Sequence, residues 1–145
     1  MTEIKRIIVG VDGSESSKAA LQWAYNEAAH HDAAVTVIAV WQPPTMPLTP
    51  PYGSLPPEGY EGQPRANALD LLERSVSNLA PRTPAVDVRT LVEEGNPAEI
   101  LIELSKEADL LVVGSRGLGG FRGMLLGSIS QHVVAHAACP VVVLR

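Results

Sequence analysis

The stretch from Gly114 to Ser128, GSRGLGGFRGMLLGS, contains six of the twelve glycines in the chain. Glycine loses more backbone freedom on folding than any other residue, so this density indicates that something approaches the main chain closely. A helix-like segment follows, and the first amides of a helix lack intrahelical partners and attract phosphate. Arg116 and Arg122 could pair with phosphate oxygens. The stretch therefore predicts an anion site, most simply for the phosphate tail of a nucleotide.

Spacing separates this stretch from two common nucleotide-binding motifs. It contains no lysine and no GxxxxGK[ST], so it is not a Walker-type loop. The pattern GxGxxG also fails, because Arg122 stands where the count from Gly117 and Gly119 requires a glycine. The spacing that does fit is G-x2-G-x9-G-S, formed by Gly114, Gly117, Gly127 and Ser128.

The elements that must position these residues follow from an alternation of short apolar runs and helix-like stretches. The expected strands are 5–11, 33–41, 85–94, 109–114 and 140–144, and the expected helices are 14–31, 66–80, 95–108 and 128–138. Strict alternation predicts one α/β domain over residues 1–145, with a doubly wound parallel sheet. The stretch 42–64 holds eight of the twelve prolines and is expected to be a loop inserted after the second strand.

Two of the expected strands contain an apolar run that ends in glycine, IIVG at Gly10 and LLVVG at Gly114. Ligands of doubly wound sheets bind beyond the carboxyl ends of the strands, where the winding reverses. If the first and fourth strands are neighbours at that point, GVDGS and GSRGLGG face one crevice. The anion site is then a wall of that crevice.

Three helix starts carry capping signals. Asn96, followed by Pro97, is a good N-cap for the third helix. Ser128 is expected to cap the fourth helix, with Gln131 as its capping-box partner. Asp12 allows two interpretations. It could cap the first helix, in competition with Ser14, or it could contact a ligand.

Composition excludes several classes of protein. The net charge of −5 and a pI near 5.3 argue against a general binder of nucleic acid or of anionic membranes. No run approaches the roughly 20 apolar residues that span a bilayer. The single cysteine, Cys139, cannot form an internal disulfide, which fits a reducing cytoplasm. We expect Cys139 to pack as a small apolar residue beside Pro140 rather than to react.

At this point the sequence resembles the universal stress protein family of the ATP-binding type, whose signature is the G-x2-G-x9-G-[ST] spacing. The resemblance covers the whole chain, through IIVGVDGS, GNPAEIL, ADLLVVGSRG and CPVVVL. It implies a five-stranded parallel sheet in the order 3-2-1-4-5 with four helices, and ATP, with Mg²⁺, at the ends of strands one and four. It also implies frequent dimers. Because the last strand, Pro140 to Leu144, is apolar and would lie at a sheet edge, we expect a homodimer built on it.

The resemblance assigns roles to individual residues. Gly114 and Gly117 would let the loop wrap the phosphates and ribose, and Gly127 and Ser128 would hold the terminal phosphates. Asp12 would lie by the adenine and ribose, and Val40 would meet adenine through its backbone. The implied nucleotide-binding set is Gly10, Asp12, Val40, Gly114, Ser115, Arg116, Gly117, Leu118, Gly119, Gly120, Gly127, Ser128, Ile129 and Ser130.

Other interpretations stand beside this one. A glycine-rich loop can be only a flexible turn, and the stretch 42–64 can be a mobile loop, a docking peptide or a lid over the nucleotide. His132 and His136 have the spacing of a metal pair, but no third ligand is evident and no protein metal site is expected.

For function, the leading hypothesis is a cytoplasmic ATP-binding regulatory protein of the stress response. The alternatives are a slow ATPase, or an interaction module that binds another adenine nucleotide such as cyclic AMP. Hydrolysis needs a positioned base near the γ-phosphate, and no carboxylate is expected there, so binding should exceed turnover.

Overall fold

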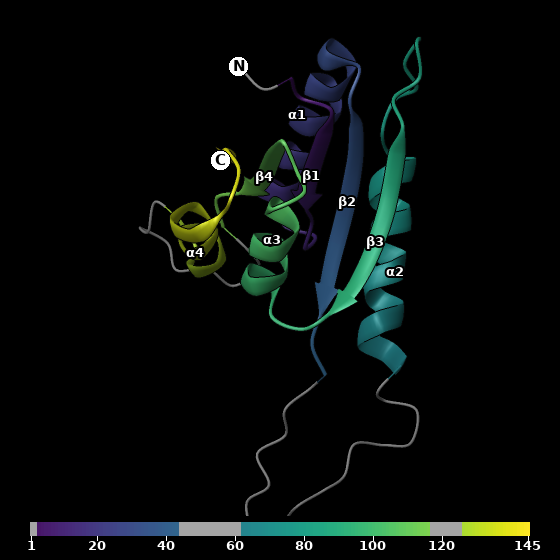
Figure 1. Cartoon of the computed structure of the whole chain (residues 1–145). Helices are drawn as coiled ribbons and strands as arrows, with labels where there is room; N and C mark the ends of the chain where they lie inside the picture. The colour runs from purple at the N-terminus through teal and green to yellow at the C-terminus, as the bar shows by residue number, and fades with distance from the viewer. Residues whose placement is uncertain (1–2, 44–61, 117–125) are drawn as a thin grey trace, which may run out of the picture.

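The computed structural model describes residues 3–43, 62–116 and 126–145. The five strands are β1 (Arg6–Gly10), β2 (Ala34–Trp41), β3 (Val88–Glu94), β4 (Leu110–Gly114) and β5 (Val141–Leu144). The four helices are α1 (Glu15–His31), α2 (Gly62–Ser77), α3 (Pro97–Ser105) and α4 (Ser128–His136). All strand pairs are parallel, and the sheet order is β3-β2-β1-β4-β5, which confirms the predicted fold (Figure 1).

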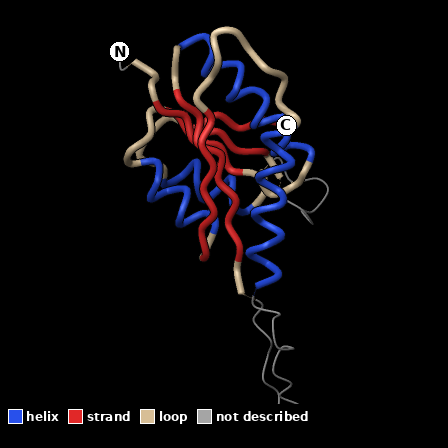
Figure 2. The backbone as a smooth tube through the Cα atoms, turned by 90° about the vertical axis from the view of Figure 1, so that its right-hand side faces the viewer, coloured by secondary structure: helices blue, strands red, loops and turns tan. Residues whose placement is uncertain are grey.

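The sheet lies between two layers of helices (Figure 2). Alternate residues of a strand point to opposite faces, so Ile7 and Val9 of β1 pack in one core with α1 and α2. Ile8 of the same strand packs in the other core, with α3 and α4. The central strands are therefore apolar on both faces, as parallel sheets covered by helices require.

The helix starts follow the sequence signals in two cases of three. The Ser14 hydroxyl accepts a hydrogen bond from Ser17 N at 3.3 Å, so Ser14 is the N-cap of α1. Asn96 caps α3, because its side chain accepts a hydrogen bond from Glu99 N at 3.1 Å. Both caps occupy unpaired amides of the first turn.

The expected cap of α4 is wrong. Gly127 is the N-cap, it makes no side-chain cap bond, and Ser128 is the first helical residue. The Gln131 side-chain amide instead donates to Leu126 O at 3.0 Å. The helix begins one residue earlier than the capping box requires. Ser128 already lies inside the helix, so its hydroxyl is not at the N-cap position.

Helix α2 also differs from its prediction. It begins at Gly62, inside the stretch 42–64 that we expected to be a loop. The spacing of Leu69, Leu72, Val76 and Leu79 predicts that they share one side of this helix, but Leu69 is 42% exposed, whereas Ala68 and Leu72 are buried. The helix is thus rotated so that Ala68, a smaller residue, faces the sheet and lets α2 pack closely.

Candidate functional site

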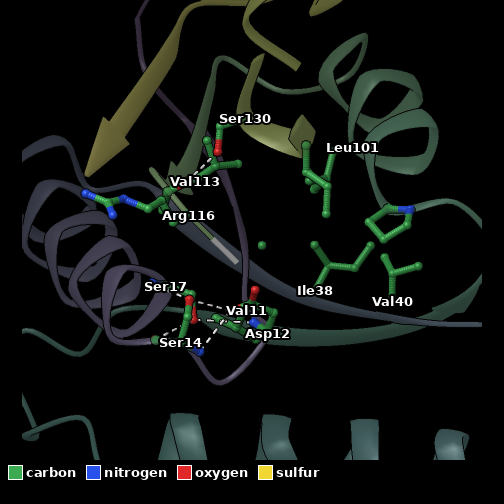
Figure 3. Close-up of a pocket in the computed structure, with 14 residues that line it drawn as sticks. Val11, Asp12, Ser14, Ser17, Ile38, Val40, Leu101, Val113, Arg116 and Ser130 are labelled. Atoms are coloured by element: carbon green, nitrogen blue, oxygen red, sulfur yellow. Dashed lines mark hydrogen bonds between the residues drawn. The ribbon is translucent and has the colours of Figure 1, made fainter. Parts of the chain in front are cut away.

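A cleft opens where the carboxyl ends of β1 and β4 meet the starts of three helices (Figure 3). Its empty space, counted together with open solvent at its mouth, is about 560 Å³. Its position beyond the carboxyl ends of the strands is the one predicted for this topology. The described lining residues are Gly10, Val11, Asp12, Ser14, Ser17, Ile38, Val40, Pro97, Leu101, Val113, Gly114, Arg116, Ile129 and Ser130.

A hydrogen-bonded turn after β1 forms one side of the cleft. The Asp12 carboxylate accepts hydrogen bonds from Ser14 N at 2.9 Å and from the Ser14 hydroxyl at 2.5 Å. The Ser17 hydroxyl donates to Ser14 O at 3.0 Å and accepts from Asp12 N at 3.3 Å. These bonds fix the Asp12 carboxylate in place before any ligand arrives, while Ser14 takes the capping role.

Apolar side chains form the opposite side. Ile38 and Val40 come from β2, and Pro97 and Leu101 come from the first turns of α3, all on the cleft wall (Figure 3). Gly10 makes room for this wall, because a Cβ there would lie 3.3 Å from Leu101 Cδ1. A flat aromatic base would meet apolar surface on this side.

Main-chain groups of Val40 complete that wall. Ile38 O accepts from Val11 N at 2.9 Å, so the Ile38 main chain faces β1, and Trp41 O accepts from Gly95 N at 2.9 Å on the β3 side. Because main-chain groups alternate along a strand, those of Val40 also face the β1 side. The pairing of β1 with β2 ends at Gly10 and Ile38, and among the described residues no strand continues β1 beside Val40. Val40 therefore presents one donor and one acceptor toward the cleft.

The end of β4 is held between two helices. A Cβ at Gly114 would lie 2.7 Å from Ser16 C and 2.8 Å from Ser17 N, so the first turn of α1 rests directly on this glycine. On the other side, the buried Ser130 hydroxyl of α4 donates to Gly114 O at 2.6 Å. Gly114 is thus required for helix packing, a reason that glycine spacing in the sequence does not reveal.

The start of α4 borders the cleft, which Ile129 and Ser130 line. Gly127 N donates to Ser115 O at 2.6 Å, which holds the helix start against the end of β4. The next three amides, those of Ser128, Ile129 and Ser130, are the first of the helix and have no intrahelical acceptor. The positive end of the helix dipole adds to their attraction for an anion.

Charge in the described lining is sparse and divided. Arg116 is the one cation and Asp12 the one carboxylate among the described lining residues. Arg116 is exposed, and its side chain is directed away from the apolar wall (Figure 3). The described cleft thus has an apolar side for a base and a polar side, at the first amides of α4, for an anion.

Seven of the residues expected at the site line this cleft, namely Gly10, Asp12, Val40, Gly114, Arg116, Ile129 and Ser130. Ser115, Gly127 and Ser128 lie beside it without lining it, and Gly117, Leu118, Gly119 and Gly120 fall outside the described residues. The sequence reading missed seven lining residues, which are Val11, Ser14, Ser17, Ile38, Pro97, Leu101 and Val113. The available signal was topological, because α3 begins at the same edge of the sheet as α1 and α4.

The other reactive side chains lie elsewhere. His132 and His136 face each other on α4 with ring centroids 4.9 Å apart, and the described residues hold no group of three or more potential metal ligands. Burial raises the pKa of the Cys139 thiol, which disfavours the reactive thiolate at neutral pH. None of the described helices has both the length and the apolar character that crossing a membrane requires.

Fold and cleft together define a doubly wound α/β protein with a cleft at the switch point of its sheet. A model of the universal stress protein family matches residues 3–145, so the chain belongs to that family. A universal stress protein of Mycolicibacterium smegmatis is 38% identical over 141 residues, which cover 96% of this chain and 45% of the relative. The chain therefore spans less than half the length of that relative.

Two solved structures extend the comparison. The universal stress protein UspA from Lactobacillus plantarum is similar over 100% of both chains, with a TM-score of 0.79 and 24% identity, a likeness of fold. A universal stress protein in complex with cAMP is 27% identical, with a TM-score of 0.63 over 99% of this chain and 98% of that one.

Proposed function

We propose that this universal stress protein binds an adenine nucleotide in the cleft, with ATP and Mg²⁺ as its ligand, and acts as a nucleotide-dependent regulatory module in the stress response. The observation that carries the proposal is the combination in one cleft of an apolar wall, the Val40 main chain and the first amides of α4. Each of these matches one part of a nucleotide.

The base would lie on the wall made by Ile38, Pro97 and Leu101. Adenine carries an exocyclic amine, a donor, next to a ring nitrogen that accepts. The acceptor and donor of the Val40 main chain complement these two groups. This arrangement reads the base through backbone atoms, so the identity of the Val40 side chain matters less than the path of β2.

The phosphates would lie at the start of α4. Amides of Ser128, Ile129 and Ser130 provide donors, and Gly127 keeps the helix start close to β4. The Ser130 hydroxyl is committed to Gly114 O and does not donate to a ligand in this arrangement. The residues Gly117 to Gly120, which precede this helix in the sequence, are proposed as further phosphate contacts.

Mg²⁺ would be held chiefly by the nucleotide. This ion usually binds phosphates, waters and one or two carboxylates rather than an all-protein cage. Asp12 is the one described carboxylate of the lining, and Ser14 already donates to it twice. A base for hydrolysis at the terminal phosphate is not among the described lining residues, so binding is expected to exceed turnover.

Cyclic AMP is a second candidate ligand. The structure of the relative that is 27% identical contains cAMP. A cyclic monophosphate carries a single negative charge, and the amides at the start of α4 provide donors for its phosphate oxygens. The protein would then be an interaction module that responds to a cyclic nucleotide.

The test begins with protein purified without added nucleotide. It is denatured, and the small molecules released are identified by chromatography and mass spectrometry. Calorimetry then measures binding of ATP with and without Mg²⁺, of AMP and of cAMP, with GTP as the control nucleotide. We expect an adenine nucleotide in the extract and tighter binding of ATP than of GTP. An extract free of adenine nucleotides, together with no heat from any of these ligands, overturns the proposal.

A further inference from the structure

Ser16 lies outside the cleft lining but contacts the main chain of Arg116, which lies in it. It is the second residue of α1 and is half-buried. Its hydroxyl donates to Arg116 O at 2.6 Å and accepts from Arg116 N at 3.4 Å. One side chain therefore satisfies both main-chain groups of Arg116, across a sequence separation of 100 residues.

The same helix turn touches the residue two positions earlier. Gly114 has no room for a Cβ, since Ser16 C would lie 2.7 Å away. The strand end from Gly114 to Arg116 is thus fastened to α1 by one close backbone contact and by the Ser16 hydroxyl. Ser130 fastens it to α4 through Gly114 O. The two helix starts and the end of β4 form one connected unit.

We propose that Ser16 is a positioning residue for the phosphate side of the cleft, an inference that rests on the proposed nucleotide binding. Its hydroxyl proton is committed to Arg116 O, so Ser16 does not donate to the ligand. It acts through Arg116, by holding the main chain there at a fixed place relative to the Asp12 turn of α1. The base side of the cleft does not depend on this bond, because Ile38, Val40 and Leu101 come from β2 and α3.

Because different elements form the two sides of the cleft, the proposal predicts that loss of the Ser16 hydroxyl affects some ligands and not others. Removing the Ser16 hydroxyl releases the Arg116 main chain, which weakens ligands that carry phosphate and spares adenosine, which carries none. The net worth of an intramolecular hydrogen bond is about 1 kcal/mol. We therefore expect Ser16→Ala to lower AMP affinity up to about fivefold and adenosine affinity less than about twofold.

The experiment measures binding of AMP and of adenosine by calorimetry to the parent, Ser16→Ala and Ser16→Thr. Alanine is a good helix former, so α1 should still form in the first variant. Threonine keeps the hydroxyl and should restore most of the AMP affinity. Ser75→Ala is the matched control, because the Ser75 hydroxyl also donates to a backbone carbonyl, Leu71 O, at 2.6 Å, but Ser75 does not line the cleft and does not contact Arg116. If Ser16→Ala does not fold, Ser16→Cys keeps the shape and offers only a weak donor.

The outcomes separate this inference from the proposed function. A selective loss of AMP binding in Ser16→Ala or Ser16→Cys, with Ser75→Ala like the parent, supports the inference. Equal losses for AMP and adenosine, or no loss for either, overturn it and leave nucleotide binding intact. If the parent itself binds neither compound, the proposed function is overturned, and the inference with it.

Discussion

Two glycines, Gly10 and Gly114, end neighbouring central strands, and their missing side chains make room for different neighbours. At Gly10 the nearest atom to an added Cβ would be Leu101 Cδ1, at 3.3 Å. At Gly114 the neighbours would be Ser16 Oγ, Ser16 C and Ser17 N, the last two being backbone atoms at 2.7 and 2.8 Å. A leucine methyl can turn aside, whereas a helix backbone cannot, so the two positions differ in what they tolerate.

This difference gives a prediction for stability. We expect Gly114→Ala to lower the free energy of unfolding by about 1–3 kcal/mol, the usual cost of overpacking a tight contact. Gly10→Ala should stay within about 1 kcal/mol of the parent, because alanine recovers backbone entropy in a strand while Leu101 adjusts. Urea denaturation of both variants measures the difference. Equal stability of the two variants would show that the α1 turn yields, contrary to this account.

The two serines at the start of α4, Ser128 and Ser130, also differ from each other in their contacts. Ser128 is exposed and does not cap the helix, whereas Ser130 is 3% exposed and donates to Gly114 O. Ser130→Ala would leave the partly buried Gly114 carbonyl without this donor, which costs about 1 kcal/mol or more. Ser128→Ala should change the free energy of unfolding by less than about 0.5 kcal/mol. Chemical denaturation distinguishes them, and a larger loss for Ser128→Ala would restore it as the cap.

At the scale of elements, Asp109 joins the beginnings of β1 and β4. Its carboxylate accepts hydrogen bonds from Lys5 N and Arg6 N, each at 2.9 Å, and its own amide donates to Arg6 O at 2.9 Å. The two backbone hydrogen bonds lower the pKa of Asp109. The two central strands are therefore aligned at their amino ends by a carboxylate, whereas at the other end Ser16 and Ser130 attach β4 to α1 and α4.

This lowered pKa predicts a dependence of stability on pH. A carboxyl group whose pKa is lower in the folded state stabilises the fold above its unfolded pKa of about 3.9, and this contribution disappears as pH falls through the folded pKa. We expect Asp109→Asn to be less stable than the parent at pH 7, and the difference to shrink toward pH 3. Urea denaturation at both pH values measures it. Asp70→Asn, which removes only the exposed ion pair with Arg74, is the control. A difference that does not change with pH would contradict this role.

The order of elements was predictable because local patterns determine it. Runs such as 110–114 are apolar throughout, and a parallel sheet covered on both faces produces such runs. The cap at Asn96 was predictable for the same reason, since its signal lies within four residues. The rotation of α2, which buries Ala68 and exposes Leu69, was not predictable, because the close packing of α2 on β2 decides it.

The candidate site, too, was predictable from the sequence only where the signal is local. Glycine spacing indicated the end of β4, and the topology placed Gly10, Asp12 and Gly114 in one cleft. Pro97 and Leu101 were missed because their role depends on where α3 begins in space. The packing role of Gly114 was missed because its partner, Ser16, lies about a hundred residues earlier in the sequence. Contacts between distant segments carry no local signal.

At the scale of the whole molecule, β5 ends the sheet on one side, next to β4. Its side chains are half-buried, with Val142 and Leu144 toward the core of α1 and α2, and Val141 and Val143 toward the core of α3 and α4. Pro140 O and Leu144 O accept hydrogen bonds from Leu111 N and Ser115 N, so the main chain of even-numbered residues faces β4. The main chain of Val141 and Val143 therefore faces outward, at an apolar edge that can pair with a second copy.

The homodimer through Pro140 to Leu144 remains a prediction. The direction of the main-chain groups of β5 shows which substitution tests it. Lysine at Val142 would damage the core as well as the edge, because Val142 packs against α1 and α2. Val143→Pro removes an outward N–H while leaving the hydrogen bonds to β4, and Val143→Ala loses comparable packing but keeps that N–H. Light scattering should show a dimer for the parent and for Val143→Ala, and a monomer for Val143→Pro, with circular dichroism confirming that all three are folded.

A parent that is monomeric at micromolar concentration refutes the dimer. A Val143→Pro variant that still dimerises shows that the copies meet through another surface, since strand pairing at β5 requires the N–H that proline lacks.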